Sequence, residues 1–116
     1  MENLSDKKCI PCRGGIPPLT NAEIDALKPF VPGWQVKEVD GIKWLERVFK
    51  LKNYAGALAF TNQIGAIAEE EDHHTLIVTE WGRVTVQWWT HVISGLHNND
   101  FIMAAKTDTL ADNFLS

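Results

Sequence analysis

The chain has 116 residues, of which 45% are apolar and 22% are charged. This length and composition fit one compact globular domain that buries roughly two-thirds of its unfolded surface, and they exclude a second domain. The formal net charge is −4, from 11 basic and 15 acidic residues. There is no excess of Lys and Arg to neutralise a phosphate backbone, so we expect no direct nucleic-acid partner.

No segment of the sequence approaches the roughly 18 consecutive apolar residues that a membrane-spanning helix needs. The first eight residues also lack the apolar stretch of a signal peptide. We therefore expect a soluble cytoplasmic protein with no membrane partner.

The two cysteines, Cys9 and Cys12, are close in a segment rich in Pro and Gly. Such a segment holds neither a helix nor a regular strand, so residues 1–18 are predicted to form an irregular arm. A structural zinc site normally needs four ligands, and a redox pair is expected between a strand and a helix. We expect two reduced thiols in a mobile arm, although half a zinc site completed by another chain stays open.

The folded domain is predicted to span residues 19–116, beginning with a short helix. Thr20 and Glu23 have the spacing of a capping box, which marks a helix N-terminus. Pro29 ends this pattern within about two turns, because proline is excluded from a helix interior.

Two segments, 34–39 and 42–51, flank Asp40-Gly41, a pair suited to the positive φ angles of a tight hairpin turn. They are predicted to be antiparallel strands. Side chains alternate between the two faces of a strand. The core face of the second strand is expected to carry the residues of one parity, namely Leu45, Arg47, Phe49 and Leu51.

Asn53 can cap a long helix that follows this hairpin. The helix runs into four carboxylates at residues 69–72, at the end where the macrodipole disfavours negative charge. We therefore expect a cationic or protonated neighbour there. The helical spacing of three and four is set by Ala57, Leu58, Thr61, Ile64, Ile67 and Ala68.

Segments 76–79 and 83–91 are predicted to form a second hairpin, in which alternation places Trp88 and Trp89 on opposite faces. Asn98 can then cap a last helix. The predicted order is helix, strand, strand, helix, strand, strand, helix. Four antiparallel strands with three helices on one face give an α+β, two-layer domain.

Three of the four histidines, His73, His74 and His91, lie near the end of the long helix and the last strand. The unperturbed pKa of histidine, about 6.5, lets it donate and accept protons at neutral pH. Glu69 precedes His73 by four residues, so the two share a face if the helix persists, and the carboxylate then favours the imidazolium. His97, in a loop rich in Asn and Gly, is expected only to be exposed.

These residues also admit other interpretations. Histidines at a helix end can simply complement the dipole, and tryptophans are more often core or subunit-contact residues than a ligand surface. Glu69, His73 and His91 would also suit a metal site of two histidines and one carboxylate.

The histidine pattern resembles the signature of the pterin-4a-carbinolamine dehydratases. In that family a Glu is followed after three residues by a His-His pair, a hairpin, a Thr-His pair, Gly-Leu and Asp. Sixteen residues separate His74 from His91 here, and the resemblance extends from about residue 19 to 110. The matching segments are 33–34, 49–54, 69–74, 90–91, 95–96, 100–101 and 104–106.

The resemblance implies that the chain dehydrates 4a-hydroxytetrahydropterin to quinonoid dihydropterin by histidine acid and base catalysis, in tetrahydropterin recycling. It implies no metal and no cofactor, since the pterin is the substrate, and a homodimer or homotetramer. His73, His74 and His91 fall on the family's three active-site histidines, while Glu69 and Asp100 fall on acidic positions near the pocket.

One position departs from the family pattern, which usually has Pro after the His-His pair, where this chain has Thr75. Proline would keep His74 out of the helical region, so Thr75 leaves the orientation of His74 less constrained. A binding module without catalysis is an open alternative, since animal members of the family also act as a dimerisation partner of a homeodomain transcription factor.

Overall fold

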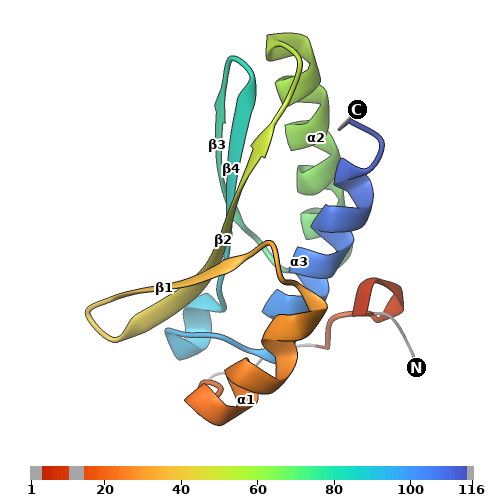
Figure 1. The fold of residues 1–116 in the computed structure, drawn as a ribbon. Helices are drawn as coiled ribbons and strands as arrows, with labels where there is room; N and C mark the ends of the chain where they lie inside the picture. Colours follow the sequence, from red (N-terminus) through yellow and green to blue (C-terminus); the bar gives the residue numbers. More distant parts are fainter. Residues whose placement is uncertain (1–3, 11–14, 115–116) are drawn as a thin grey trace.

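A computed structural model describes residues 4–10 and 15–114 of the chain (Figure 1). Helices α2 and α3 pack on one face of a four-stranded antiparallel sheet, which confirms the predicted α+β, two-layer domain. In order the elements are η1 (Leu4–Asp6), α1 (Asn21–Leu27), η2 (Lys28–Phe30), β1 (Gln35–Val39), β2 (Ile42–Lys50), α2 (Tyr54–Glu70), β3 (Leu76–Glu80), β4 (Arg83–Trp88), η3 (His91–Ile93) and α3 (Asn98–Ala111).

The sheet has the strand order β1-β2-β4-β3, so the two hairpins meet along β2 and β4. The first hairpin turns at Asp40 and Gly41, whose φ angles are 53° and 80°. This is the positive region that the Asp-Gly pair predicted. The second hairpin turns at Trp81 and Gly82, of which Gly82 has a φ of 72°.

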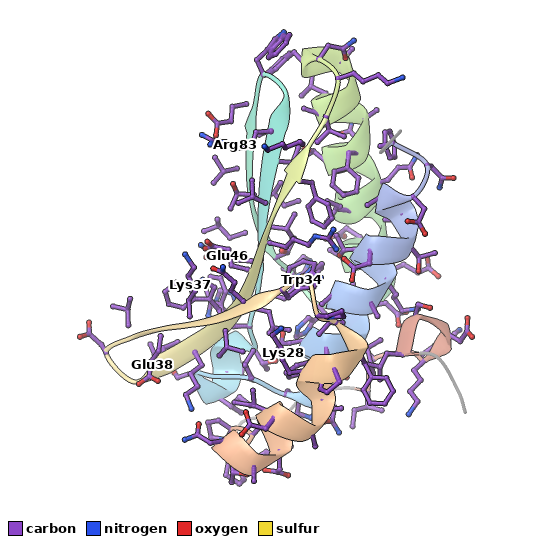
Figure 2. All side chains as sticks on the ribbon, viewed as in Figure 1. Lys28, Trp34, Lys37, Glu38, Glu46 and Arg83 are labelled. Carbon is purple, nitrogen blue, oxygen red and sulfur yellow. The ribbon has the colours of Figure 1, made fainter. Side chains whose placement is uncertain are left out.

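Alternation along β2 places one set of side chains against the helices. Leu45 and Phe49 are 0% and 1% exposed, and Leu51 just beyond the strand is 9% exposed, which confirms the predicted core face. Arg47 shares this parity, and its guanidinium pairs with Asp108 of α3 at 2.7 Å. The opposite face of the sheet carries polar residues together with exposed valines at positions 48 and 78. Figure 2 shows Lys37 and Glu46 on this face, pointing away from the helices, and they form an ion pair at 3.0 Å.

Helix α2 begins where the sequence predicted, because the side chain of Asn53 accepts a hydrogen bond from the Gly56 amide. Its core stripe differs from the prediction at Leu58, which is 42% exposed because it lies about 100° around the helix from buried Ala57. The buried residues are Ala57, Phe60, Ile64 and Ala68.

Two predicted boundaries near the end of the chain are wrong. Strand β4 ends at Trp88, because the chain then turns and Thr90 pairs with Gly95 in an isolated bridge. His91 therefore begins η3 and does not lie on the strand. Helix α3 is capped by His97 rather than by Asn98.

Within residues 4–10 and 15–114, every helix is too short or too polar to cross a membrane.

Candidate active site

A cavity of about 520 Å³ lies where the end of α2, the segment after β4 and the first turn of α3 meet. The structure brings all three histidines singled out in the sequence to this cavity, although they come from segments on both sides of a hairpin. Its wall includes Asp72, His73, His74, Trp89, Thr90 and His91.

The direction of the two adjacent histidines is set by a chain reversal at the end of α2. The helix stops at Glu70, and Asp72 adopts a left-handed φ of 50°. The His73 amide then donates to the carbonyl of Ala68 at 2.9 Å, a bond typical of a Schellman helix end. Asp tolerates this backbone region better than most side chains. His73 and His74 consequently leave the helix axis in different directions.

His73 is buried, with 8% of its surface exposed, and its partner is a carboxylate of α3. Its Nε2 lies 2.6 Å from Oδ1 of Asp100, which is fully buried. The other carboxylate oxygen of Asp100 accepts from the Thr90 hydroxyl and from the His97 amide, both at 2.9 Å. Three hydrogen bonds therefore fix Asp100, and Asp100 fixes the ring of His73, which also stacks on Trp88 at 5.8 Å.

His74 is exposed and contacts Glu69, whose Oε1 lies 2.6 Å from its Nε2. Glu69 was expected to share a face with His73 if the helix persisted, and this condition is not met. The reason is that α2 ends before either histidine, so the spacing of four residues no longer describes their geometry.

His91 lies on the exposed rim of the cavity and stacks on Trp89, with 4.3 Å between the ring centroids. The turn that carries it is closed by the Thr90 amide, which donates to the Gly95 carbonyl at 2.8 Å. The same Thr90 donates its hydroxyl to Asp100, so one residue connects the His91 turn to the buried His73 pair.

Thr75 stands where the family pattern has Pro, and its hydroxyl has a defined partner. The Oγ1 atom donates to the carbonyl of Gln87 at 2.5 Å, which ties the start of β3 to β4. A side-chain hydrogen bond thus holds the exit from α2 at this point.

Other titratable groups near the cavity do not form a metal cluster. In the part of the chain that the structure describes, no three His, Cys, Asp or Glu side chains converge on a common point suitable for a metal ion. The metal site considered for Glu69, His73 and His91 is not assembled in this arrangement, because Glu69 contacts His74 instead. Cys9 lies beside the cavity, and Cys12 falls outside the described residues.

Two residues of the site were missed in the sequence. His97 is half-buried and accepts a hydrogen bond from the Asn99 amide through Nδ1, while its own amide donates to Asp100. The expectation that His97 is merely exposed is therefore wrong. The spacing from His97 to Asp100 is that of a capping box, and this signal was available. Asn99, by contrast, is buried by a contact that no local pattern indicates.

Comparison with known proteins places this geometry in a family. The sequence profile described as pterin 4 alpha carbinolamine dehydratase matches residues 17–110. The chain belongs to the pterin-4a-carbinolamine dehydratase family. The match includes all five residues carried over from the family signature, namely Glu69, His73, His74, His91 and Asp100.

Relatives of the dehydratase family cover nearly the whole chain. A protein of Syntrophotalea carbinolica is 54% identical over 97% of this chain and 100% of its own length, and one of Microcystis aeruginosa is 50% identical over 95% of each chain. Both carry the name "Putative pterin-4-alpha-carbinolamine dehydratase". A solved structure from Brucella melitensis, described as a transcriptional coactivator/pterin dehydratase, is 34% identical, covers 81% of this chain and 98% of that chain, and has a TM-score of 0.73.

Proposed function

We propose that this protein catalyses the loss of water from 4a-hydroxytetrahydropterins, with His73, His74 and His91 as the acid and base groups. In this reaction the bond between C4a and the hydroxyl oxygen breaks, and a double bond forms between C4a and N5. One proton is added to the departing hydroxyl and one is removed from N5. The products are water and the quinonoid dihydropterin, so the balance requires no electron acceptor and no redox cofactor.

The observation that carries the proposal is the meeting of three imidazoles in one cavity, one of them held by a buried carboxylate. A dehydration of this kind needs one proton donor and one acceptor close to adjacent atoms of the substrate. If the Nε2 proton of His73 is held by Asp100, Nδ1 is the ring nitrogen that can exchange a proton. His74 and His91 are exposed, line the same cavity and can supply the second transfer.

Each carboxylate has a supporting role in this proposal. Asp100 orients His73 from within the core, and Glu69 orients His74 from the surface. The surface pair has 62% and 78% of its side chains exposed, so solvent screens it strongly. We therefore assign the larger contribution to Asp100.

The test follows the decay of a freshly generated 4a-hydroxytetrahydropterin by its ultraviolet absorbance, with and without the protein. His73→Ala and His91→Ala should each lower the enzymatic rate by roughly 10²–10⁴, the usual contribution of a positioned acid or base. Asn98→Ala is the matched control, because Asn98 is exposed on the first turn of α3. Wild-type rates in both folded histidine variants would contradict the assignment, and no acceleration by the wild type would contradict the activity itself.

A further inference from the structure

The segment Leu4–Ile10, which we call the N-terminal strap, packs along α3 beside the cavity. Figure 1 shows η1, its first part, next to this helix. Leu4 joins the hydrophobic core with 9% exposure, and Lys106 of α3 donates to the Ser5 carbonyl at 2.9 Å. At its other end, Cys9 and Ile10 line the 520 Å³ cavity that also holds the three histidines. The strap is thus both part of the fold and part of the wall of the site.

Asn99 fastens the strap with both halves of its side-chain amide. Its Oδ1 accepts from the Ile10 amide at 3.0 Å, and its Nδ2 donates to the Ile10 carbonyl at 2.7 Å. Asn99 is only 2% exposed, so both hydrogen bonds are shielded from solvent and are stronger than they would be on an exposed surface. Glu71 provides a second attachment, because its carboxylate accepts from the Cys9 amide at 2.8 Å.

Both attachments are adjacent to the residues that position His73. Asn99 immediately precedes Asp100, and Glu71 lies in the turn that leads from α2 to His73. The strap is therefore attached beside both members of the His73–Asp100 pair. Its location relative to the site is fixed by the same two elements that fix the imidazole.

The wall that the strap contributes is uncharged. Burial, helped by the nearby carboxylates of Glu71 and Asp100, raises the pKa of the Cys9 thiol to about 12, so the thiol stays protonated at neutral pH. The amides of Cys9 and Ile10 and the Ile10 carbonyl already have partners in Glu71 and Asn99. The Ile10 side chain is 61% exposed and presents aliphatic surface.

This chemistry selects one part of a pterin. The pyrimidinone ring carries amide and amino groups that need hydrogen-bond partners, whereas the Cys9 and Ile10 amides and the Ile10 carbonyl are already paired. The substituent at C6 lies next to the reacting N5 and C4a atoms and contains aliphatic carbon. We propose that the N-terminal strap is a specificity-determining wall that contacts the C6 substituent of the substrate, and that Asn99 holds it in place; this rests on the proposed function.

The kinetic test compares Asn99→Ala with the exposed control Asn98→Ala on two substrates, the 4a-hydroxy derivatives of tetrahydrobiopterin and of tetrahydropterin without a C6 substituent. Asn99→Ala should raise KM for the substituted substrate roughly tenfold, as expected for lost aliphatic contacts, and any change in kcat should be the same for both substrates. KM for the unsubstituted substrate should barely change. Equal changes for both substrates, no change, or a loss of kcat alone would overturn the proposal.

Ile10→Gly keeps the test informative if Asn99→Ala fails to fold. The Ile10 side chain is largely exposed, and its hydrogen bonds to Asn99 are made by the backbone, so this change removes the aliphatic wall and leaves the attachment. We expect the same selective rise in KM. An Ile10→Gly protein with unchanged selectivity between the two substrates would overturn the proposal.

A second readout reports the strap itself and does not need catalysis. In a Cys12→Ser background Cys9 is the only thiol, and alkylation by iodoacetamide measures its release, because the thiolate is the reactive form. Asn99→Ala should speed alkylation at least about tenfold, and Asn98→Ala should not. An unchanged rate in Asn99→Ala would show that Asn99 does not hold the strap.

The two proposals fail in different ways. If the wild type does not dehydrate the substrate, the proposed function is wrong, yet the strap can still be tested by ligand protection. Bound 7,8-dihydrobiopterin should then slow Cys9 alkylation more than bound 7,8-dihydropterin without a side chain. Equal protection by the two ligands, or none, would overturn the inference about the C6 substituent.

Discussion

Replacing Asp100 by Asn should change which ring nitrogen of His73 carries the proton. The substitution keeps the size of the side chain but turns one oxygen into an NH₂ group, which only donates. The His97 amide is an obligate donor to Asp100, and the Thr90 hydroxyl also donates to the same oxygen in the native arrangement. The remaining Asn oxygen is therefore retained on that side, and the NH₂ group faces Nε2 of His73.

His73 must then accept through Nε2 and carry its proton on Nδ1, the opposite tautomer from the one we assign to the native site. In the catalytic triad of serine proteases, the corresponding Asp to Asn replacement lowers kcat by about 10⁴ because the histidine adopts the wrong tautomer. We expect a loss of roughly 10²–10⁴ here. The free energy of unfolding should fall by about 1.5–3 kcal/mol, the usual contribution of a hydrogen bond to a charged group.

The rate is measured with the absorbance assay, and stability by urea unfolding. Asp112→Asn is the matched control, because Asp112 is an exposed acid at the other end of α3. The double variant with His73→Ala separates positioning from direct action: if Asp100 acts through His73, the double variant is no slower than His73→Ala alone. A folded Asp100→Asn protein with more than about half the wild-type rate would refute the tautomer argument.

Gly95→Ala should destabilise the turn that carries His91, because a Cβ atom there would lie 2.8 Å from Cβ of Pro18; we expect a loss of about 1–3 kcal/mol in urea unfolding, and an unchanged midpoint would contradict this. Thr75→Pro should retain the fold and the activity, since residues 73–75 lie outside any helix or strand and proline lowers the entropy of the unfolded chain, which offsets the lost bond to Gln87. A marked fall in Tm would show that His74 needs a conformation that proline excludes. We also expect a closed symmetric dimer or tetramer, because Val48 and Val78 are each 48% exposed on the uncovered face of the sheet. Light scattering that gives the monomer mass of 13.0 kDa at every concentration would refute this expectation.

The sequence predicted best what depends on neighbouring residues. The capping box of Thr20 and Glu23, the turn at Asp40-Gly41 and the cap at Asn53 are all present, because each is decided within a few residues of the chain. The parity of β2 was also correct, since burial on one face imposes strict alternation on a strand.

Errors near the site came from the assumption that a regular element continues. Glu69 would face His73 only if α2 continued past Asp72. Asp72 instead adopts a left-handed φ, the chain leaves the helix direction there, and Glu69 contacts His74. His91 was placed on a strand that ends three residues earlier. The family signature nevertheless named three histidines that all line the cavity, because a sequence signature marks residues without describing their geometry.

The strap illustrates what no local pattern could indicate. Ile10 and Asn99 are 89 residues apart, and neither belongs to a periodic apolar pattern that would mark the contact. The spacing of Cys9 and Cys12 suggests metal or redox chemistry, whereas Cys9 lines the cavity and its thiol contacts the Asn99 carbonyl.

The bonds between Ile10 and Asn99 also determine when the site is completed during synthesis. Ribosomes release a chain from its N-terminus, so the strap emerges first and α3, which carries both Asn99 and Asp100, emerges after every other element of the site. Until α3 has left the ribosome, the strap lacks its attachment to Asn99 and His73 lacks the carboxylate of Asp100. A nascent chain that already contains both hairpins and α2 therefore still lacks the His73–Asp100 pair, which forms in one late step.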